Sequence, residues 1–79
     1  MYVKATLVKL VTDDGITDMC DHVKVGDMYL VDPDRIRTLV WGREGQPKVR
    51  VPRPSIFVAA NENGAEGWMP LELLKLEKN

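Results

Sequence analysis

The sequence predicts an all-β domain of five or six short antiparallel strands. Three observations lead to this fold class. Short stretches are rich in β-branched residues, Gly, Pro and Asn recur roughly every 8–12 residues, and no segment keeps a helical period. With 79 residues, the chain has room for a single domain spanning residues 1–79, with a thin core. Such a pattern favours a small barrel or a sandwich.

The first half of the chain contains two of the expected strands. Residues 2–12 nearly alternate between apolar and polar side chains, and Asp13, Asp14 and Gly15 then predict a turn. Residues 16–22 are polar and indicate a loop or a brief edge strand. Residues 28–31 form the next strand, which we expect to end at Pro33 because proline cannot donate to a strand ladder.

The second half continues with short strands over residues 36–41, 48–51 and 55–60. The first two are separated by a turn at residues 42–47, and Pro52 and Pro54 are expected to end the second one. We expect the core to bury one apolar residue from each part of the chain: Val8, Leu30, Val49, Phe57, Met69 and Leu74.

The tail resembles the end of SH3 domains, in which a Gly, two apolar residues and a Pro lead through a 3₁₀ turn into the last strand. Those places are held here by Gly67, Trp68, Met69 and Pro70. The resemblance implies an SH3-like antiparallel barrel, with residues 71–74 as the 3₁₀ turn and residues 75–77 as the closing strand. It also suggests a small bacterial or phage accessory protein.

The same resemblance argues against binding of proline-rich ligands. Peptide-binding SH3 domains carry an Asn-Tyr pair in the 3₁₀ turn, whereas this chain has Glu72 and Leu73 there. Because small barrels serve many functions, the fold alone assigns none.

Charge is unevenly distributed along the chain, although the net charge is only −1. Residues 35–53 contain six cations and a single acid, Glu44, while the flanking segments are acidic. If the strands on either side of the 42–47 turn form a hairpin, five of these cations converge around Trp41 on one face: Arg35, Arg37, Arg43, Lys48 and Arg50. The candidate binding residues are therefore Arg35, Arg37, Trp41, Arg43, Lys48, Arg50 and Trp68.

Three interpretations of this basic face remain open at this point. It can dock an acidic protein partner through Arg and Trp side chains, which are typical interface anchors. It can instead bind nucleic acid, with cations on the phosphates and Trp41 stacked on a base. The third interpretation is a solvated strand face with Trp41 and Trp68 packed into the core. We expect the first, a non-enzymatic interaction module.

No residue pattern indicates catalysis, a cofactor or a metal. Asp18, Cys20 and His22 are the nearest approach to a metal-ligand cluster, but one Cys and one His fall short of a structural zinc site. The single cysteine cannot form an internal disulfide, and no apolar stretch is long enough for a membrane helix. The first residues do not resemble a signal peptide. We therefore expect a cytoplasmic protein.

Overall fold

The computed structural model describes residues 1–17, 23–60 and 66–77, and most of them lie in antiparallel β-strands. The elements in chain order are β1 (Val3–Leu7), β2 (Ile16–Thr17), β3 (Met28–Arg43), β4 (Gln46–Ala60), β5 (Gly67–Pro70), η1 (Leu71–Leu73) and β6 (Leu74–Leu76). The predicted all-β class is confirmed, as is the 3₁₀ turn before the last strand.

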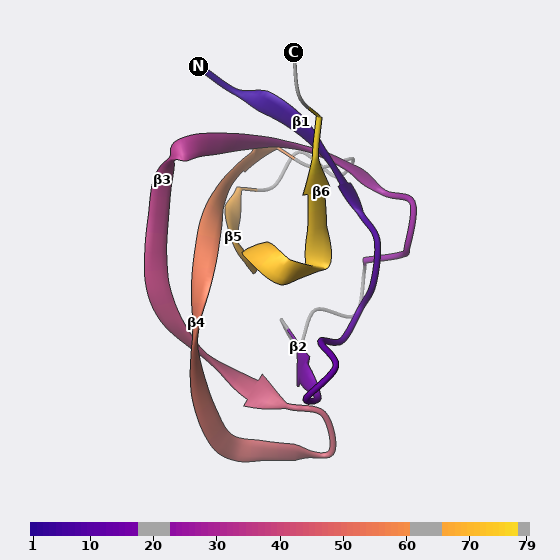
Figure 1. Cartoon of the computed structure of the whole chain (residues 1–79), viewed down its shortest axis with the longest axis vertical. Coiled ribbons are helices and arrows are strands. Elements are labelled where there is room, and N and C mark those ends of the chain that lie inside the picture. Colours follow the sequence, from indigo (N-terminus) through magenta and orange to yellow (C-terminus); the bar gives the residue numbers. More distant parts are fainter. Residues whose placement is uncertain (18–22, 61–65, 78–79) are drawn as a thin grey trace.

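The strands form one sheet in the order β5-β4-β3-β1-β6, and β2 adds to the far end of β3 (Figure 1). Every pairing between described strands is antiparallel. None of these pairings joins β5 to β6, so the sheet of the described residues is open and closure into a barrel is not observed.

Strand β3 is longer than expected because it continues past Pro33. Asp32 lies opposite Phe57 and Ile36 lies opposite Ile56, so residues 33–35 form a bulge without partners on β4. The Asp32 carboxylate stabilises this bulge by accepting a 2.9 Å hydrogen bond from the Asp34 N–H. A bulge needs no donor to the ladder, which explains why Pro33 does not end the strand. The predicted end of the strand there is wrong.

Strand β4 likewise runs through Pro52 and Pro54, where we expected two separate strands. These prolines lie opposite Val40 and Thr38 of β3, and β5 begins to pair with β4 only at Ser55. A proline is tolerated in a strand when its nitrogen faces an edge that has no neighbour. The two long strands therefore replace four predicted short ones.

The hydrophobic core lies between β1, the start of β3, the end of β4, β5, η1 and β6. Its buried members are Ala5, Leu7, Tyr29, Val31, Ile56, Val58, Met69, Leu73 and Leu74. Of the residues expected in the core, Phe57, Met69 and Leu74 are buried, whereas Val8, Leu30 and Val49 are exposed.

The three wrong assignments have simple causes. Val8 lies just beyond the end of β1. Leu30 sits between the buried residues Tyr29 and Val31, so the alternation of a strand turns it to the outer face. Val49 lies close to the hairpin turn, where the core does not extend.

Two regions of the sheet can now be distinguished. The part of the β3–β4 hairpin that lies beyond the bulge, residues 36–54, is called the arm. The base comprises β1, β5, η1 and β6 with residues 28–31 and 55–60. The molecule measures 35 × 22 × 21 Å, and Figure 1 shows the arm extending along its long axis, away from β1 and β6.

Candidate functional site

Two arginines and two aromatic rings meet where the arm leaves the base. The bulge in β3 directs Arg35 toward β4, and its guanidinium carbon lies 3.9 Å from the centroid of the Phe57 ring. Phe57 is 9% exposed. A guanidinium at this distance from a ring is attracted by the negative face of its π system.

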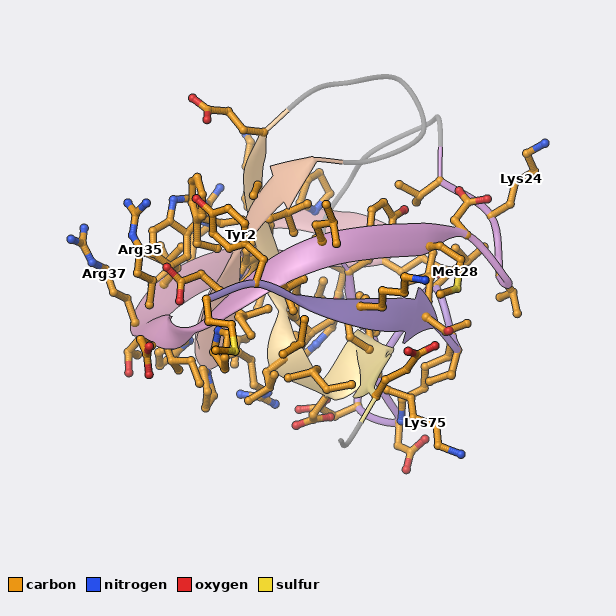
Figure 2. All side chains as sticks on the ribbon, turned by 90° about the horizontal axis from the view of Figure 1, so that it is seen from above. Tyr2, Lys24, Met28, Arg35, Arg37 and Lys75 are labelled. Carbon is orange, nitrogen blue, oxygen red and sulfur yellow. The ribbon has the colours of Figure 1, made fainter. Side chains whose placement is uncertain are left out.

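Arg37 and Trp68 complete this group. Trp68 of β5 pairs with Phe57, and the two rings meet edge to face with centroids 5.6 Å apart. The guanidinium carbons of Arg37 and Arg35 lie 5.4 Å and 5.7 Å from the Trp68 ring. We call Arg35, Arg37, Phe57 and Trp68 the aromatic–arginine cluster. In Figure 2, Arg35 and Arg37 project side by side from one end of the molecule, away from Lys24 and Lys75.

The positive charge of this cluster is not neutralised by an ion pair with any described residue. Asp32, three residues before Arg35, accepts a hydrogen bond from the Asp34 N–H instead. Because the rings support the guanidinium faces, the in-plane N–H groups remain available to an external acceptor.

Trp41 does not lie in the cluster. Its side chain is half-buried, and its indole Nε1–H donates a 2.8 Å hydrogen bond to the buried Ser55 hydroxyl. That hydroxyl in turn donates to the Arg53 carbonyl at 3.0 Å. Trp41 is therefore held by structural contacts, in agreement with the interpretation that assigned it to packing.

The remaining predicted cations do not converge around Trp41. Arg50 lies opposite Gly42, one position from the Trp41–Val51 pair, so it points to the other face of the arm. Its Nη2 donates to the Val40 carbonyl at 3.3 Å. The expectation that the five cations converge on the Trp41 face is wrong, because Val51 and not Arg50 lies opposite Trp41.

Arg43 and Lys48 lie near the far end of the arm. Arg43 packs on the 12–15 turn, where Gly15 has a φ of +88° and a Cβ there would lie 3.2 Å from the Arg43 Cγ. The half-buried Arg43 is therefore a packing residue beside β2. Lys48 is exposed and makes no ion pair with a described residue.

Arg53 is the one cation of the basic segment that forms ion pairs with acidic side chains among the described residues. Its Nη2 forms an ion pair with Asp14, and its Nε lies 3.8 Å from a carboxylate oxygen of Glu72. Arg53 thus ties β4 to the 12–15 turn and to η1, and it contributes no free charge to the arm.

Sequence reasoning missed Phe57 as a member of the site, although it correctly placed this residue in the interior. No local signal marks it, because the contact with Arg35 depends on the bulge at residues 33–35. The presence of aspartates around Pro33 was the available hint, since Asx turns often accompany such irregularities.

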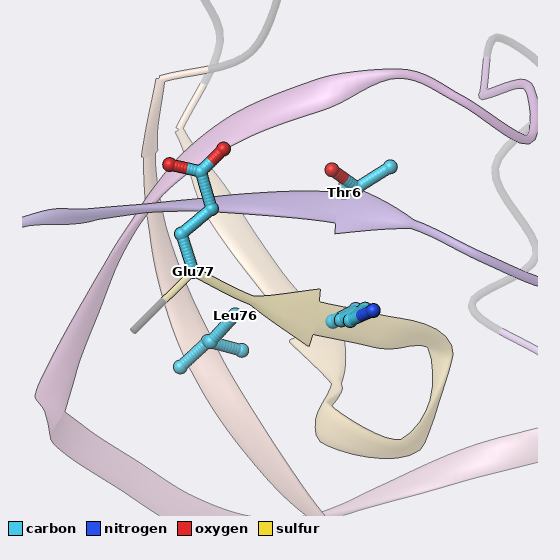
Figure 3. A pocket seen from close by; sticks show the side chains of 4 residues that line it. Thr6, Leu76 and Glu77 are labelled. Atoms are coloured by element: carbon cyan, nitrogen blue, oxygen red, sulfur yellow. The ribbon is translucent and has the colours of Figure 1, made fainter. Parts of the chain in front are cut away.

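A surface hollow beside β6 is lined by fewer groups that could bind or transform a ligand than the aromatic–arginine cluster contains. It is lined by Thr6, Lys75, Leu76 and Glu77 at the paired ends of β1 and β6 (Figure 3). One lysine and one glutamate with a threonine do not make a recognisable catalytic arrangement.

Asp18, Cys20 and His22, which the sequence pattern did not support as a zinc site, lie outside the described residues. Within the described ranges, no group of His, Cys, Asp and Glu side chains could hold a metal ion. The described part of the chain has no helix with the length and apolar character needed to cross a membrane. The chain matches no family model, and comparison with curated proteins and with solved structures gave no match either.

Proposed function

We propose that this domain is a non-enzymatic interaction module that docks an acidic protein partner at the aromatic–arginine cluster. One observation carries the proposal: Arg35 and Arg37 lie on the rings of Phe57 and Trp68 without an ion pair to any described residue. Arg and Trp are also the residues most enriched among the energetic centres of protein interfaces.

The chemistry of the cluster suits carboxylates. A guanidinium presents its N–H groups in a rigid planar fork that matches the two oxygens of a carboxylate. Contact with the rings restricts both arginine side chains before a partner arrives, which lowers the conformational entropy lost on binding. The surrounding positive charge would accelerate encounter with an acidic surface.

Nucleic acid is the alternative ligand of the aromatic–arginine cluster. The arrangement of the aromatic rings favours it less than an acidic protein. Stacking on a base requires an accessible ring face. Phe57 is buried, both guanidiniums lie near Trp68, and Trp41 is held by Ser55. Binding to phosphates alone would give strongly salt-dependent affinity with little stacking contribution.

A charge-reversal experiment tests the proposal. We would measure fluorescence anisotropy of a labelled glutamate-rich peptide with the parent protein and with the Arg35→Glu/Arg37→Glu variant. The matched control is Lys24→Glu/Lys75→Glu, which changes the net charge equally at two exposed positions far from the cluster (Figure 2). Reversal within the cluster should weaken binding at least about 10-fold, since buried or stacked arginines dominate such interfaces.

The control pair should bind within about 2-fold of the parent, because exposed charges farther away than a Debye length are screened. Equal losses in both variants would mean that only net charge matters and would contradict the proposal. Tighter binding of a single-stranded oligonucleotide than of the peptide would favour the nucleic-acid alternative. Circular dichroism melts of both variants check that the fold is intact.

We also propose an SH3-like relationship and a cytoplasmic setting in a bacterium or phage. The succession of β5, η1 and β6 supports the first of these, because it follows the tail pattern that carries the resemblance. The single cysteine supports the second, since small secreted domains usually rely on disulfides.

A further inference from the structure

The outer edge of β3 in the arm has no neighbouring strand among the described residues. β1 pairs with β3 only as far as Val31, and β2 pairs with it only at Gly42 and Arg43. Between these points, Asp32 and residues 36–41 pair with β4 alone, and the bulge at residues 33–35 has no partner strand among the described residues. In Figure 1 the first part of this stretch follows the left border of the molecule, with β4 on its inner side.

The prolines of β4 determine which backbone groups face that edge. Thr38 and Val40 lie opposite Pro54 and Pro52, which have no N–H to donate. These must be the non-hydrogen-bonded pairs of the antiparallel ladder, so the N–H and C=O groups of Thr38 and Val40 point away from β4. The bond from the Arg50 guanidinium to the Val40 carbonyl agrees with this direction.

The two edges of the arm therefore differ in their capacity to accept another strand. On β4 the outward positions are occupied by Pro52 and Pro54, and proline on an edge prevents further pairing. On β3 the outward N–H groups of Thr38 and Val40 are retained. An edge that retains its outward N–H groups is a template for strand addition by an extended peptide, although such a peptide would have to displace the Arg50 side chain from the Val40 carbonyl.

The side chains along the open edge indicate the chemistry of its occupant. Ile36 and Val40 are 46% and 52% exposed, and they share one face of the strand with Thr38. Arg37 projects from the opposite face. An added strand would thus meet apolar side chains on one face and a guanidinium on the other.

We infer that the partner contributes an extended acidic segment that adds antiparallel to the β3 edge at residues 36–40. Its alternate apolar side chains pack on Ile36 and Val40, and its intervening carboxylates face Arg37 and the aromatic–arginine cluster. This inference rests on the proposed function and names the form of the acidic partner. A second copy of the chain is disfavoured, because edge-to-edge pairing would bring the arginines of both copies together.

The probe is a short capped peptide of alternating glutamate and valine. In the proposed antiparallel pairing, valines lie opposite Thr38 and Val40, so their N–H groups bond to β3 while the glutamate N–H groups face outward. N-methylation of the valines should weaken binding at least about 10-fold, because it removes the bonding donors. N-methylation of the glutamates, with the same charge and composition, should change affinity less than about 3-fold.

The protein offers a parallel test. Thr38→Pro removes an outward N–H without removing a bond to β4, and Thr38→Ala is its matched control. The proline variant should bind the peptide at least about 10-fold more weakly than the alanine variant. Amide hydrogen exchange should show new protection at Thr38 and Val40 when the peptide is added.

The outcomes separate this inference from the proposed function. If Arg35→Glu/Arg37→Glu abolishes binding while both N-methylated peptides bind like the parent peptide, the cluster is the site and strand addition is wrong. If the peptide does not bind the parent protein at all, both proposals fail. A protein dimer that Thr38→Pro dissociates would identify a second copy as the occupant and would also overturn the inference.

Discussion

The base and the arm share two strands, β3 and β4, but the side chains of these strands differ in burial between the two regions. Ile56 and Ile36 are direct partners across β3 and β4, yet Ile56 is fully buried and Ile36 is exposed. The base packs its strands around a buried core, whereas the arm is a two-stranded ribbon whose β3 edge has no partner at residues 36–41 among the described residues. The ribbon carries Arg37, Arg43, Lys48, Arg50 and Arg53. The difference teaches that the buried core lies in one region, whereas the other carries exposed side chains, and the aromatic–arginine cluster forms where the two regions meet.

The largest effect should come from removing core volume in the base. Leu73→Ala deletes a side chain that is fully buried in η1 and should lower the free energy of unfolding by about 2–5 kcal/mol. Val40→Ala in the arm should change it by less than about 0.5 kcal/mol. Urea denaturation measures both values.

If the Leu73→Ala variant does not fold, two smaller substitutions, one in the base and one in the arm, allow the same comparison of unfolding free energies. Ile56→Val should cost about 0.5–1.5 kcal/mol, while Ile36→Val should cost almost nothing, although the two residues face each other. Equal costs in the base and the arm would show that the arm contributes to the core, against our description.

An intermediate effect is expected at the junction of the two regions. Trp41→Phe keeps an aromatic ring but removes the donor to the buried Ser55 hydroxyl, so unfolding should become easier by about 1–2 kcal/mol. In the Ser55→Ala background, the same Trp41→Phe change should cost less, because the hydrogen bond is already absent. Additive costs in thermal unfolding would mean that the bond contributes little.

The sequence predicted the composition of the base better than the shape of the arm. The tail of the chain was correctly interpreted because Pro70 and the following leucines form a compact local pattern that becomes η1 and β6. The hairpin turn was also marked locally, with Gly45 at a φ of +75°. Such features depend on neighbours in the sequence and need no knowledge of the register between strands.

The candidate site depended on long-range pairing that no local pattern specifies. Pro33, Pro52 and Pro54 were interpreted as strand ends, although one lies in a bulge and the others face an edge. The bulge brings Arg35 to Phe57, and the register turns Arg50 away from Trp41. Charge counting therefore found the basic segment but not the arrangement of its side chains.

The smallest effect should come from the ion pairs that link the arm to its surroundings. Arg53→Gln removes the contacts with Asp14 and Glu72, both of which are substantially exposed. Exposed ion pairs contribute little, so we expect a loss of less than about 1 kcal/mol that shrinks at high salt. A larger, salt-independent loss would indicate that Arg53 acts mainly through packing and that the arm is part of the folded base.

Amide hydrogen exchange of the free protein tests most directly whether the arm presents an open edge while the base holds the fold. We predict slow exchange at buried base positions such as Val31 and Ile56, and at Arg37 and Leu39, whose N–H groups bond to β4. Thr38 and Val40 should exchange rapidly, which gives an alternating pattern along β3. Uniform protection from Arg37 to Val40 would contradict the account, because it would mean that the outer edge of β3 is already occupied within the chain.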